Sequence, residues 1–247
     1  MTLSSVATEP LDVTPNHFPD GFLGVVMLDT RFPRPEGDIG HPSAFGVPTR
    51  RCVISGAWPD KIVQSGAGLR KGRVVTPILQ LVRRLAHDGA KAITTSCGFL
   101  VLLQKEMQAQ VKIPVITSSL LQVPNLLKLH AKVGVLTISS SKLGVEHLRA
   151  AGVPAGRMAD VVVQGVDAKS EFATVILGNH PEMNIEKAAA DVLAAAVALK
   201  KREPTLTCVV LECTNMPPYR AAIEAATGMK TWALVDDERL IRPWAQA

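Results

Sequence analysis

The feature of this sequence that most restricts its fold is a regular alternation of short apolar runs with longer segments of helical period, and this alternation occurs twice. The runs of the first half cover residues 22–28, 51–55, 91–96 and 113–117, and those of the second half cover 132–138, 160–165, 207–212 and 231–236. Short runs rich in Val, Ile and Leu are typical of strands buried on both faces of a parallel sheet. The sequence therefore predicts an α/β fold.

Segments of helical period fill the intervals between these runs. Pro77 suits the first turn of a helix, and the apolar residues after it keep helical spacing until Gly89 stops the pattern. Gly228 is well placed to end the last helix. The other helices are expected at 98–107, 120–130, 141–151, 181–202 and 217–227. Strands that alternate with helices in this way predict parallel sheets with helices packed on their faces.

The two halves also repeat individual residues. Gly-Val-Val at 24–26 opens the first half and Gly-Val-Leu at 134–136 opens the second, while Cys97 and Cys213 each end a strand just before a helix. Coincidence among common α/β patterns is the alternative, but the matched positions favour a duplication. The sequence therefore predicts two similar α/β halves.

A chain of 247 residues is long enough for two compact domains. We expect a loose leader at 1–21, a first domain at 22–130 and a second at 131–236. The C-terminal segment, from about 215 to 247, is free to pack on the first domain because strand order cannot be read from the sequence.

Residues 30–50 interrupt this regularity with a stretch that is rich in proline and glycine and has no period. Loops of this length in compact domains are usually functional or disordered. This one follows the first strand, so it begins at the carboxyl edge of the sheet, where open α/β folds bind ligands. A substrate-contacting loop is the preferred interpretation, and a solvated insertion is the alternative.

Composition excludes several classes of partner. The formal net charge is only +5 and aromatic residues make up 4% of the chain, so little is available for binding nucleic acid. No apolar run reaches the length of a membrane span, and the polar N-terminus lacks the pattern of a signal peptide. Four irregularly spaced cysteines fit cytosolic thiols better than a disulfide framework. A cytoplasmic protein is expected, and a homo-oligomer stays open.

Two of the cysteines are predicted to be reactive. Cys97 and Cys213 lie at strand-to-helix turns among small hydroxyl and amide residues, where backbone N–H groups favour a thiolate. Cys52 and Cys208 lie inside apolar strands and are expected only to pack. A thiolate and a thiol on opposite sides of a substrate can remove a proton from carbon and return one to the other face.

The same turns supply groups that could hold a carboxylate. They are Thr95, Ser96, the amide of Gly98, Thr214 and Asn215. These donors would stabilise the negative charge that grows on a carboxylate as the neighbouring carbon loses its proton. A small carboxylate-bearing molecule is therefore the expected partner.

Other chemistries find no support in the sequence. It contains no CxxC, HxH or HExxH pattern, so no metal site is predicted. It also contains no phosphate-binding or dinucleotide glycine motif after a strand, and no GxSxG turn of a serine hydrolase.

At the two cysteine motifs the sequence resembles the aspartate/glutamate racemase superfamily, over residues 22 to 236. The superfamily includes glutamate, aspartate and hydantoin racemases, maleate isomerase and arylmalonate decarboxylase. The resemblance implies two Rossmann-like α/β domains with parallel sheets, related by a pseudo-twofold axis, with the active site in the cleft between them and no cofactor. It also implies that Cys97 and Cys213 are catalytic, and that Asp29, Thr30, Thr214 and Asn215 contact the substrate.

Two motifs differ from the usual family pattern. Cys97-Gly98-Phe99 stands where amino-acid racemases usually have Cys-Asn-Thr, and Glu212 precedes the second cysteine in place of the usual Gly. Phe99 is expected to add an apolar wall to the site. Arg31 and Arg34 could supply a carboxylate clamp, with a solvated loop surface as the alternative. Glu212 would either favour a protonated Cys213 thiol or face away from the site.

The leading expectation is a cofactor-independent racemase or epimerase that acts on a small carboxylate-bearing substrate, such as an amino acid or a hydantoin. One alternative is cis-trans isomerisation of a maleate-like diacid through a cysteine adduct. A second is a non-catalytic two-lobed protein that binds a small acid. A third is a thiol-redox protein, which would require the two sulfurs to come within disulfide distance.

Overall fold

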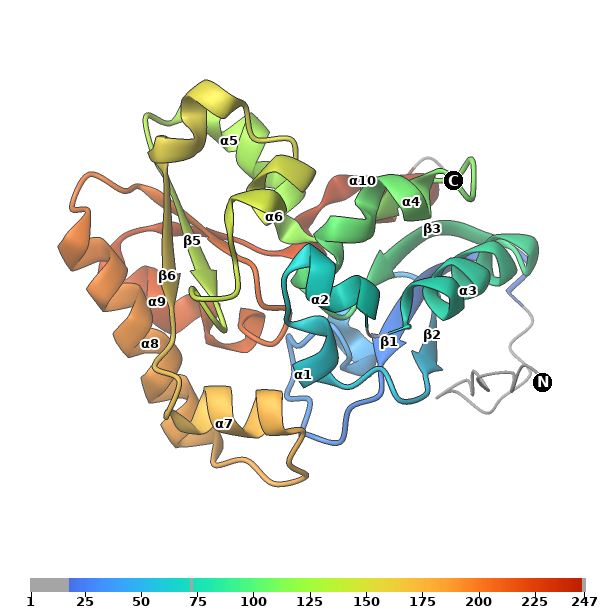
Figure 1. Cartoon of the computed structure of the whole chain (residues 1–247), viewed down its shortest axis with the longest axis horizontal. Coiled ribbons are helices and arrows are strands. Elements are labelled where there is room, and N and C mark those ends of the chain that lie inside the picture. The colour runs from blue at the N-terminus through green and yellow to red at the C-terminus, as the bar shows by residue number, and fades with distance from the viewer. Residues whose placement is uncertain (1–17, 72, 246–247) are drawn as a thin grey trace.

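Two four-stranded parallel sheets form the centre of the computed structural model, which describes residues 18–71 and 73–245 (Figure 1). The first sheet has the order β2-β1-β3-β4 and the second has the order β6-β5-β7-β8. The strands are β1 (Phe22–Leu28), β2 (Thr49–Ile54), β3 (Ala90–Thr95), β4 (Val115–Ile116), β5 (Val133–Thr137), β6 (Val161–Gly165), β7 (Cys208–Leu211) and β8 (Lys230–Trp232). Each predicted run overlaps one strand, and the two sheets have the same strand order. The predicted α/β class with two similar parallel sheets is confirmed.

Helices connect the strands and cover the sheets. The α-helices are α1 (Pro59–Ile62), α2 (Gly66–Lys71), α3 (Val75–His87), α4 (Gln104–Gln108), α5 (Val123–Leu129), α6 (Val145–Ala150), α7 (Glu171–Gly178), α8 (Ile185–Arg202), α9 (Arg220–Thr227) and α10 (Glu238–Ala245). Short 3-10 helices precede three of them, at Gly98–Leu103 (η2), Ser119–Gln122 (η3) and Pro217–Tyr219 (η5). Among the described residues, no helix is both long enough and apolar enough to cross a bilayer.

Strand β1 shows how the first sheet is buried on both faces. All seven of its residues are buried, and they alternate between two apolar clusters. Phe22 and Val26 lie in the larger cluster with residues of α3, whereas Leu23 and Val25 lie in a smaller cluster that includes Leu240 of α10. The C-terminal helix, although it follows the second sheet in sequence, therefore packs on the first (Figure 1).

Several segments differ from the sequence expectations. Residues 234–236, expected to extend the last strand, form a 3-10 turn, and helix α8 begins at Ile185 behind an Asn184 cap rather than at 181. Helices α1, α2, α7 and α10 occupy segments for which no element was predicted. Most of the expected leader at 1–21 lies outside the described residues.

The long segment between β1 and β2 is neither regular nor fully solvated. Its Phe32, Ile39 and Phe45 side chains are buried, and Asp38 is only 1% exposed. A hydrogen bond from Ile39 N to the Thr214 carbonyl ties the segment to the second half of the chain. This segment is therefore a packed part of the molecule that reaches the end of β7.

Candidate active site

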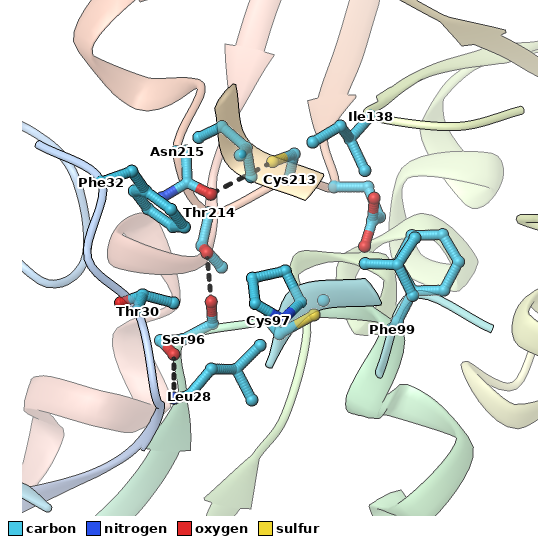
Figure 2. Close-up of a pocket in the computed structure, with 15 residues that line it drawn as sticks. Leu28, Thr30, Phe32, Ser96, Cys97, Phe99, Ile138, Cys213, Thr214 and Asn215 are labelled. Carbon is cyan, nitrogen blue, oxygen red and sulfur yellow. Dashed lines mark hydrogen bonds between the residues drawn. The ribbon is translucent and has the colours of Figure 1, made fainter. Parts of the chain in front are cut away.

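A pocket lies where strands β3 and β7 end (Figure 2). Cys97 follows β3 and Cys213 follows β7, so each sheet contributes one thiol from an equivalent strand. The pocket is lined by Leu28, Thr30, Phe32, Pro59, Val63, Ser96, Cys97, Gly98, Phe99, Ile138, Ile176, Glu212, Cys213, Thr214 and Asn215. Both halves of the chain therefore form its wall, as the duplicated pattern led us to expect.

Eight of the ten predicted site residues line this pocket. They are Thr30, Ser96, Cys97, Gly98, Phe99, Cys213, Thr214 and Asn215. Asp29 and Thr95 do not line it. The Asp29 carboxylate accepts a hydrogen bond from Gly56 N at 2.7 Å, and the buried Thr95 hydroxyl lies 2.8 Å from the Thr117 carbonyl oxygen, to which it donates. Both side chains hold the turns next to the pocket. Neither lines the pocket, so the structure does not support their predicted contact with substrate.

Ser96 links the first sheet to the second at the floor of the pocket. Its hydroxyl oxygen accepts a hydrogen bond from Leu28 N at 2.9 Å, and its carbonyl accepts one from the Thr214 hydroxyl at 2.7 Å (Figure 2). These bonds hold the turn after β3 against the turn after β7. The two cysteines are therefore fixed relative to each other by direct contacts between the turns that hold them.

A chain of hydrogen bonds connects the second cysteine to the loop after β1. The Cys213 thiol lies 3.5 Å from Asn215 Oδ1, Asn215 Nδ2 donates to Asp38 at 2.6 Å, and Arg34 donates to the same carboxylate at 2.8 Å. Arg34 also donates to the Thr30 hydroxyl at 2.8 Å. The guanidinium is thus occupied by Asp38 and Thr30, and Arg34 does not line the pocket as the expected carboxylate clamp.

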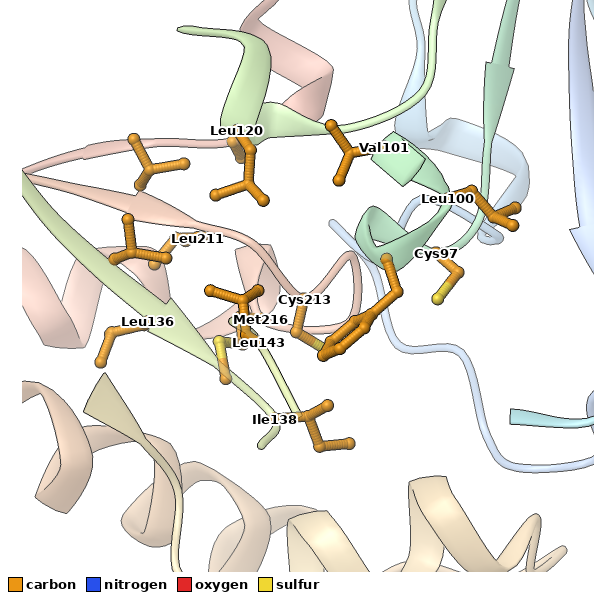
Figure 3. Packing of buried hydrophobic residues seen from close by; sticks show 14 of the residues in the cluster. Cys97, Leu100, Val101, Leu120, Leu136, Ile138, Leu143, Leu211, Cys213 and Met216 are labelled. Carbon is orange, nitrogen blue, oxygen red and sulfur yellow. The ribbon is translucent and has the colours of Figure 1, made fainter. Parts of the chain in front are cut away.

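Both thiols lie among apolar side chains. Cys97 and Cys213 belong to one cluster with Leu100, Ile138 and Met216 (Figure 3). Burial raises the pKa of the Cys97 thiol to about 12, and burial likewise raises the pKa of Cys213 well above its ordinary value. Burial disfavours the charged form of a thiol because the interior solvates it poorly.

The surroundings of the two thiols differ in charge. The charge of Glu212 raises the pKa of Cys97 further, whereas backbone hydrogen bonds from Phe99 and Leu100 and the charge of Arg34 lower it in part. The pKa of Cys213 is raised further by Glu212, Cys97 and Asp38, with only the backbone of Asn215 acting to lower it. Groups that favour a thiolate are therefore more numerous around Cys97 than around Cys213.

Glu212 is the site residue that the sequence analysis did not place. It is 1% exposed, lines the pocket, and does not face away. A charged residue at the end of the otherwise apolar run 207–212 was the available signal, because an acid in that position must be buried when the strand is. The apolar lining residues Phe32, Pro59, Val63 and Ile176 gave no comparable signal.

The described residues contain no group of three or more His, Cys, Asp or Glu side chains suited to a metal ion. The pocket lining among them also contains no Lys, Arg or His. A carboxylate in this pocket would therefore be held by hydroxyl, amide and other uncharged donors.

Comparisons with known proteins agree with this geometry. A family model described as Asp/Glu/Hydantoin racemase matches residues 53–236. Among solved structures, arylmalonate decarboxylase matches with a TM-score of 0.55 at 13% identity, covering 92% of this chain and 94% of that one. Allantoin racemase from Pseudomonas fluorescens matches with a TM-score of 0.52 at 14% identity, covering 89% and 88%. These two structures share the fold.

The relatives found by sequence are named as lyases and not as racemases. A dimethylsulfoniopropionate lyase from Durusdinium sp. clade D is 28% identical over 233 residues, which cover 89% of this chain and 74% of the relative. Dimethylsulfoniopropionate lyases 3 and 6 from Emiliania huxleyi (strain CCMP1516) are 26% and 27% identical, covering 83% of this chain and 55% of each relative. The chain thus spans about half the length of the Emiliania proteins.

Proposed function

Since the chain belongs to the Asp/Glu/hydantoin racemase family, we propose that it removes the proton from the carbon next to a carboxylate and then eliminates a leaving group from the following carbon. The substrate class is a small carboxylate with a positively charged leaving group, of which dimethylsulfoniopropionate is the example. The observation that carries the proposal is the unequal pair of buried thiols in one pocket. The names of the sequence relatives favour elimination over racemisation.

Cys97 is the base in this proposal. Backbone hydrogen bonds from Phe99 and Leu100 and the nearby charge of Arg34 lower the pKa of its thiol against the effect of burial. These groups stabilise a thiolate at the start of a helix, as is common for reactive cysteines. Cys97 would therefore receive the substrate proton on its sulfur.

Cys213 is held as a neutral thiol. Asp38 can only accept hydrogen bonds from Asn215, so the amide NH₂ faces Asp38 and the amide oxygen faces the sulfur. An amide oxygen accepts a hydrogen bond from S–H but repels a thiolate. This arrangement supports Cys213 as a proton donor.

Two hydroxyl groups are suited to hold the substrate carboxylate. Thr30 Oγ1 accepts a hydrogen bond from Arg34, and Ser96 Oγ accepts one from Leu28 N. Each hydroxyl proton is thus left free to point into the pocket that both residues line. Donors placed in this way bind a carboxylate more strongly as it gains negative charge in the transition state.

The atoms balance as follows in the elimination. The Cys97 thiolate takes the proton, the electron pair of that C–H bond forms the new carbon–carbon double bond, and the bond to the sulfonium sulfur breaks with its electrons on sulfur. The products are an unsaturated carboxylate and a neutral sulfide, and the proton on Cys97 is later lost to solvent. A cationic substrate also suits a pocket lined by two thiols and no Lys, Arg or His, because its positive charge favours the thiolate.

Racemisation or epimerisation is the second candidate, on amino-acid or hydantoin-like carboxylates. The observation in its favour is that Cys213 follows the strand equivalent to the one that Cys97 follows, so a proton donor lies on the other side of the same pocket (Figure 2). Cys213 would then protonate the carbanion on the face opposite to Cys97.

One experiment separates these candidates. The purified chain is incubated with dimethylsulfoniopropionate while dimethyl sulfide is measured by gas chromatography, and with a panel of amino acids and hydantoins in D₂O while exchange next to the carboxylate and optical rotation are followed. We expect dimethyl sulfide release. Exchange with loss of optical rotation, and no sulfide, would establish the racemase instead, and neither signal would contradict both.

Variants of the two cysteines also distinguish elimination from racemisation. C97S is expected to lower turnover at least about 100-fold in either reaction, as is typical for loss of a proton-transfer group. C213S is expected to keep elimination within about tenfold but to abolish racemisation, since only racemisation needs a second proton donor. C208A is the control, because Cys208 is a buried strand residue outside the pocket.

A further inference from the structure

The carboxyl group of Glu212 lies in the pocket with one oxygen unpaired. Its Oε2 accepts a hydrogen bond from the Thr137 hydroxyl at 2.7 Å, whereas Oε1 is buried and has no hydrogen-bond partner among the described residues. Buried polar atoms in proteins are nearly always paired, and an exception at a site calls for an explanation. A ligand that enters the pocket is the natural partner for Oε1.

The glycine after Cys97 makes room for this carboxyl group. A Cβ atom at Gly98 would lie 2.3 Å from Glu212 Oε1 and 2.4 Å from the Glu212 carbonyl oxygen. Any larger residue would therefore displace the side chain. Since Gly98 follows Cys97 and Glu212 precedes Cys213, the carboxyl group is held between the two turns that carry the thiols.

Burial favours the neutral form of Glu212. Cys97 and Cys213 interact with it from the turns after β3 and β7, and Asp38 faces Cys213 from the loop after β1. Among the described residues, Arg34 is the cation that lowers the pKa of Cys97, and its guanidinium is paired with Asp38. Burial raises the pKa of Glu212 to about 8, although the bond from Thr137 opposes this shift. Near neutral pH the group therefore carries a proton.

We propose that Glu212 is a substrate-binding acid whose neutral carboxyl group donates a hydrogen bond from Oε1 to the carboxylate of the substrate. The inference rests on the proposed function for its substrate class and adds a third donor to Thr30 and Ser96. In the complex the substrate carboxylate beside Oε1 disfavours ionisation of Glu212 and the positive leaving group favours ionisation of Cys97, so the proton stays on Glu212 and no bond to Glu212 is made or broken. The hydrogen bond strengthens as negative charge develops on the substrate, because a donor that is already in place needs no reorganisation.

A neutral Glu212 also removes a conflict within the site. An ionised carboxylate would repel the substrate carboxylate and would disfavour the Cys97 thiolate, whose pKa it raises. A protonated carboxyl group does neither and supplies a donor in a lining that has no basic side chain. The same residue would thus assist both binding and proton removal.

Two substitutions of similar size test the donor. E212Q keeps an N–H donor and cannot ionise, whereas E212M keeps the length and has no donor. We expect E212Q to retain turnover within about tenfold and E212M to lose about 100-fold or more, as when one oxyanion donor is removed. Equal losses in both variants with unchanged thermal unfolding would show that the charged carboxylate is required and overturn the proposal. Full activity in E212M would also overturn it.

A second measurement does not depend on turnover. In wild-type protein at pH 7, infrared difference spectroscopy should show a carbonyl band of a protonated carboxyl group that shifts when propionate binds. The band should be absent in E212Q and present in E224Q, because Glu224 lies near the surface and its pKa is lowered by hydrogen bonds with Thr231. A missing band in wild-type protein would overturn the proposal for Glu212. A shifted band in a protein without lyase or racemase activity would support Glu212 and leave only the proposed function contradicted.

Discussion

Two buried carboxyl groups lie within one site and are solvated by the protein to very different extents. Asp38 accepts hydrogen bonds from Arg34, Asn215 and Gly40 N, whereas Glu212 accepts only one, from Thr137. Burial costs an ionised carboxyl group more when fewer donors surround it. At the scale of single residues, the site therefore combines a well-paired acceptor, an acid with few partners and two buried thiols.

Glu212 should give the folded protein a specific dependence on pH. Its pKa is raised to about 8 from an ordinary value of 4.5, so between these values the folded state keeps a proton that the unfolded state releases. Stability therefore falls as the pH rises through this range, by up to about 1.4 kcal/mol for each pH unit. In urea denaturation at pH 5, 6, 7 and 8, wild-type protein should lose stability relative to E212Q. Parallel curves for the two proteins would contradict the assignment.

Gly98 should not tolerate even one added methyl group. G98A would place Cβ 2.3 Å from Glu212 Oε1 and 2.4 Å from the carbonyl oxygen of Glu212, so the turn after β3 must move. We expect a loss of about 1–3 kcal/mol in stability, typical of overpacking, and turnover at least about tenfold lower. The control is G156A, because nothing lies within 4 Å of a Cβ at Gly156. Urea denaturation and the sulfide assay provide the measurements.

At the scale of elements, the end of α7 fixes the start of the loop after β1. Asn179 adopts a left-handed conformation with φ of 54° at the C-terminal end of α7. Its side chain donates to the Asp29 carbonyl at 3.0 Å and accepts from Arg31 N at 2.7 Å. One residue of the second half thus holds both neighbours of Thr30, which lines the pocket.

Substitution of Asn179 should weaken both the fold and the site. N179A removes the two hydrogen bonds and places alanine at positive φ, so we expect a loss of about 1–3 kcal/mol in stability. N179G removes the same bonds without the strain and should be the less destabilised of the two. Both variants should have a higher KM, since Thr30 is no longer fixed. N125A is the control, as Asn125 lies on the exposed face of α5. An unchanged KM in both variants would contradict this role for Asn179.

Strands were easier to predict than the short helices. The run at 133–137 is apolar throughout and its strand is fully buried, so composition and environment agree there. Helix α7 reads as Glu-Phe-Ala-Thr-Val-Ile-Leu-Gly, with β-branched residues that do not favour a helix, and tertiary packing together with the Ser170 cap outweighs that preference. The last predicted strand is shortened because Asp236 accepts a hydrogen bond from Ala233 N, which turns the chain.

The site was predictable where it depends on topology and not where it depends on orientation. Cys97 and Cys213 follow equivalent strands of two separate sheets, so the duplicated pattern predicted equivalent positions for them at the carboxyl ends of the strands. The packing of one sheet edge against the other is seen only in the structure. The hydrogen bond of Asn215 with Asp38 spans 177 positions of the chain, and no local pattern encodes it. Asp29 is next to the pocket residue Thr30 in sequence, but its carboxylate accepts a hydrogen bond from Gly56 N and does not line the pocket.

At the scale of the whole molecule, helix α10 connects the two halves of the chain in addition to the pocket. Leu240 of α10 is fully buried in the cluster that contains Leu23, Val25 and Ala92 of the first sheet. The last helix of the chain therefore covers a sheet whose strands come from the beginning. Stability of the first sheet should depend on the C-terminus.

L240A tests this dependence. Removing a fully buried leucine side chain is expected to cost about 2–5 kcal/mol, which lowers the midpoint of thermal unfolding by several degrees. I241A is the matched control, because Ile241 is the next residue of the same helix and is 38% exposed, so its loss should have a much smaller effect. Calorimetry of both variants gives the comparison. Equal shifts would indicate that α10 is held by something other than its apolar face.

The position of α10 also has a consequence for synthesis of the protein. The ribosome releases β1 and β3 well before α10, so during translation one apolar face of the first sheet, with Leu23 and Val25, lacks the helix that covers it. Chains emerge at about 5–20 residues per second, which leaves that face open for seconds. That face is therefore available to chaperones that bind apolar segments, and the first sheet completes its packing only after α10 has been synthesised.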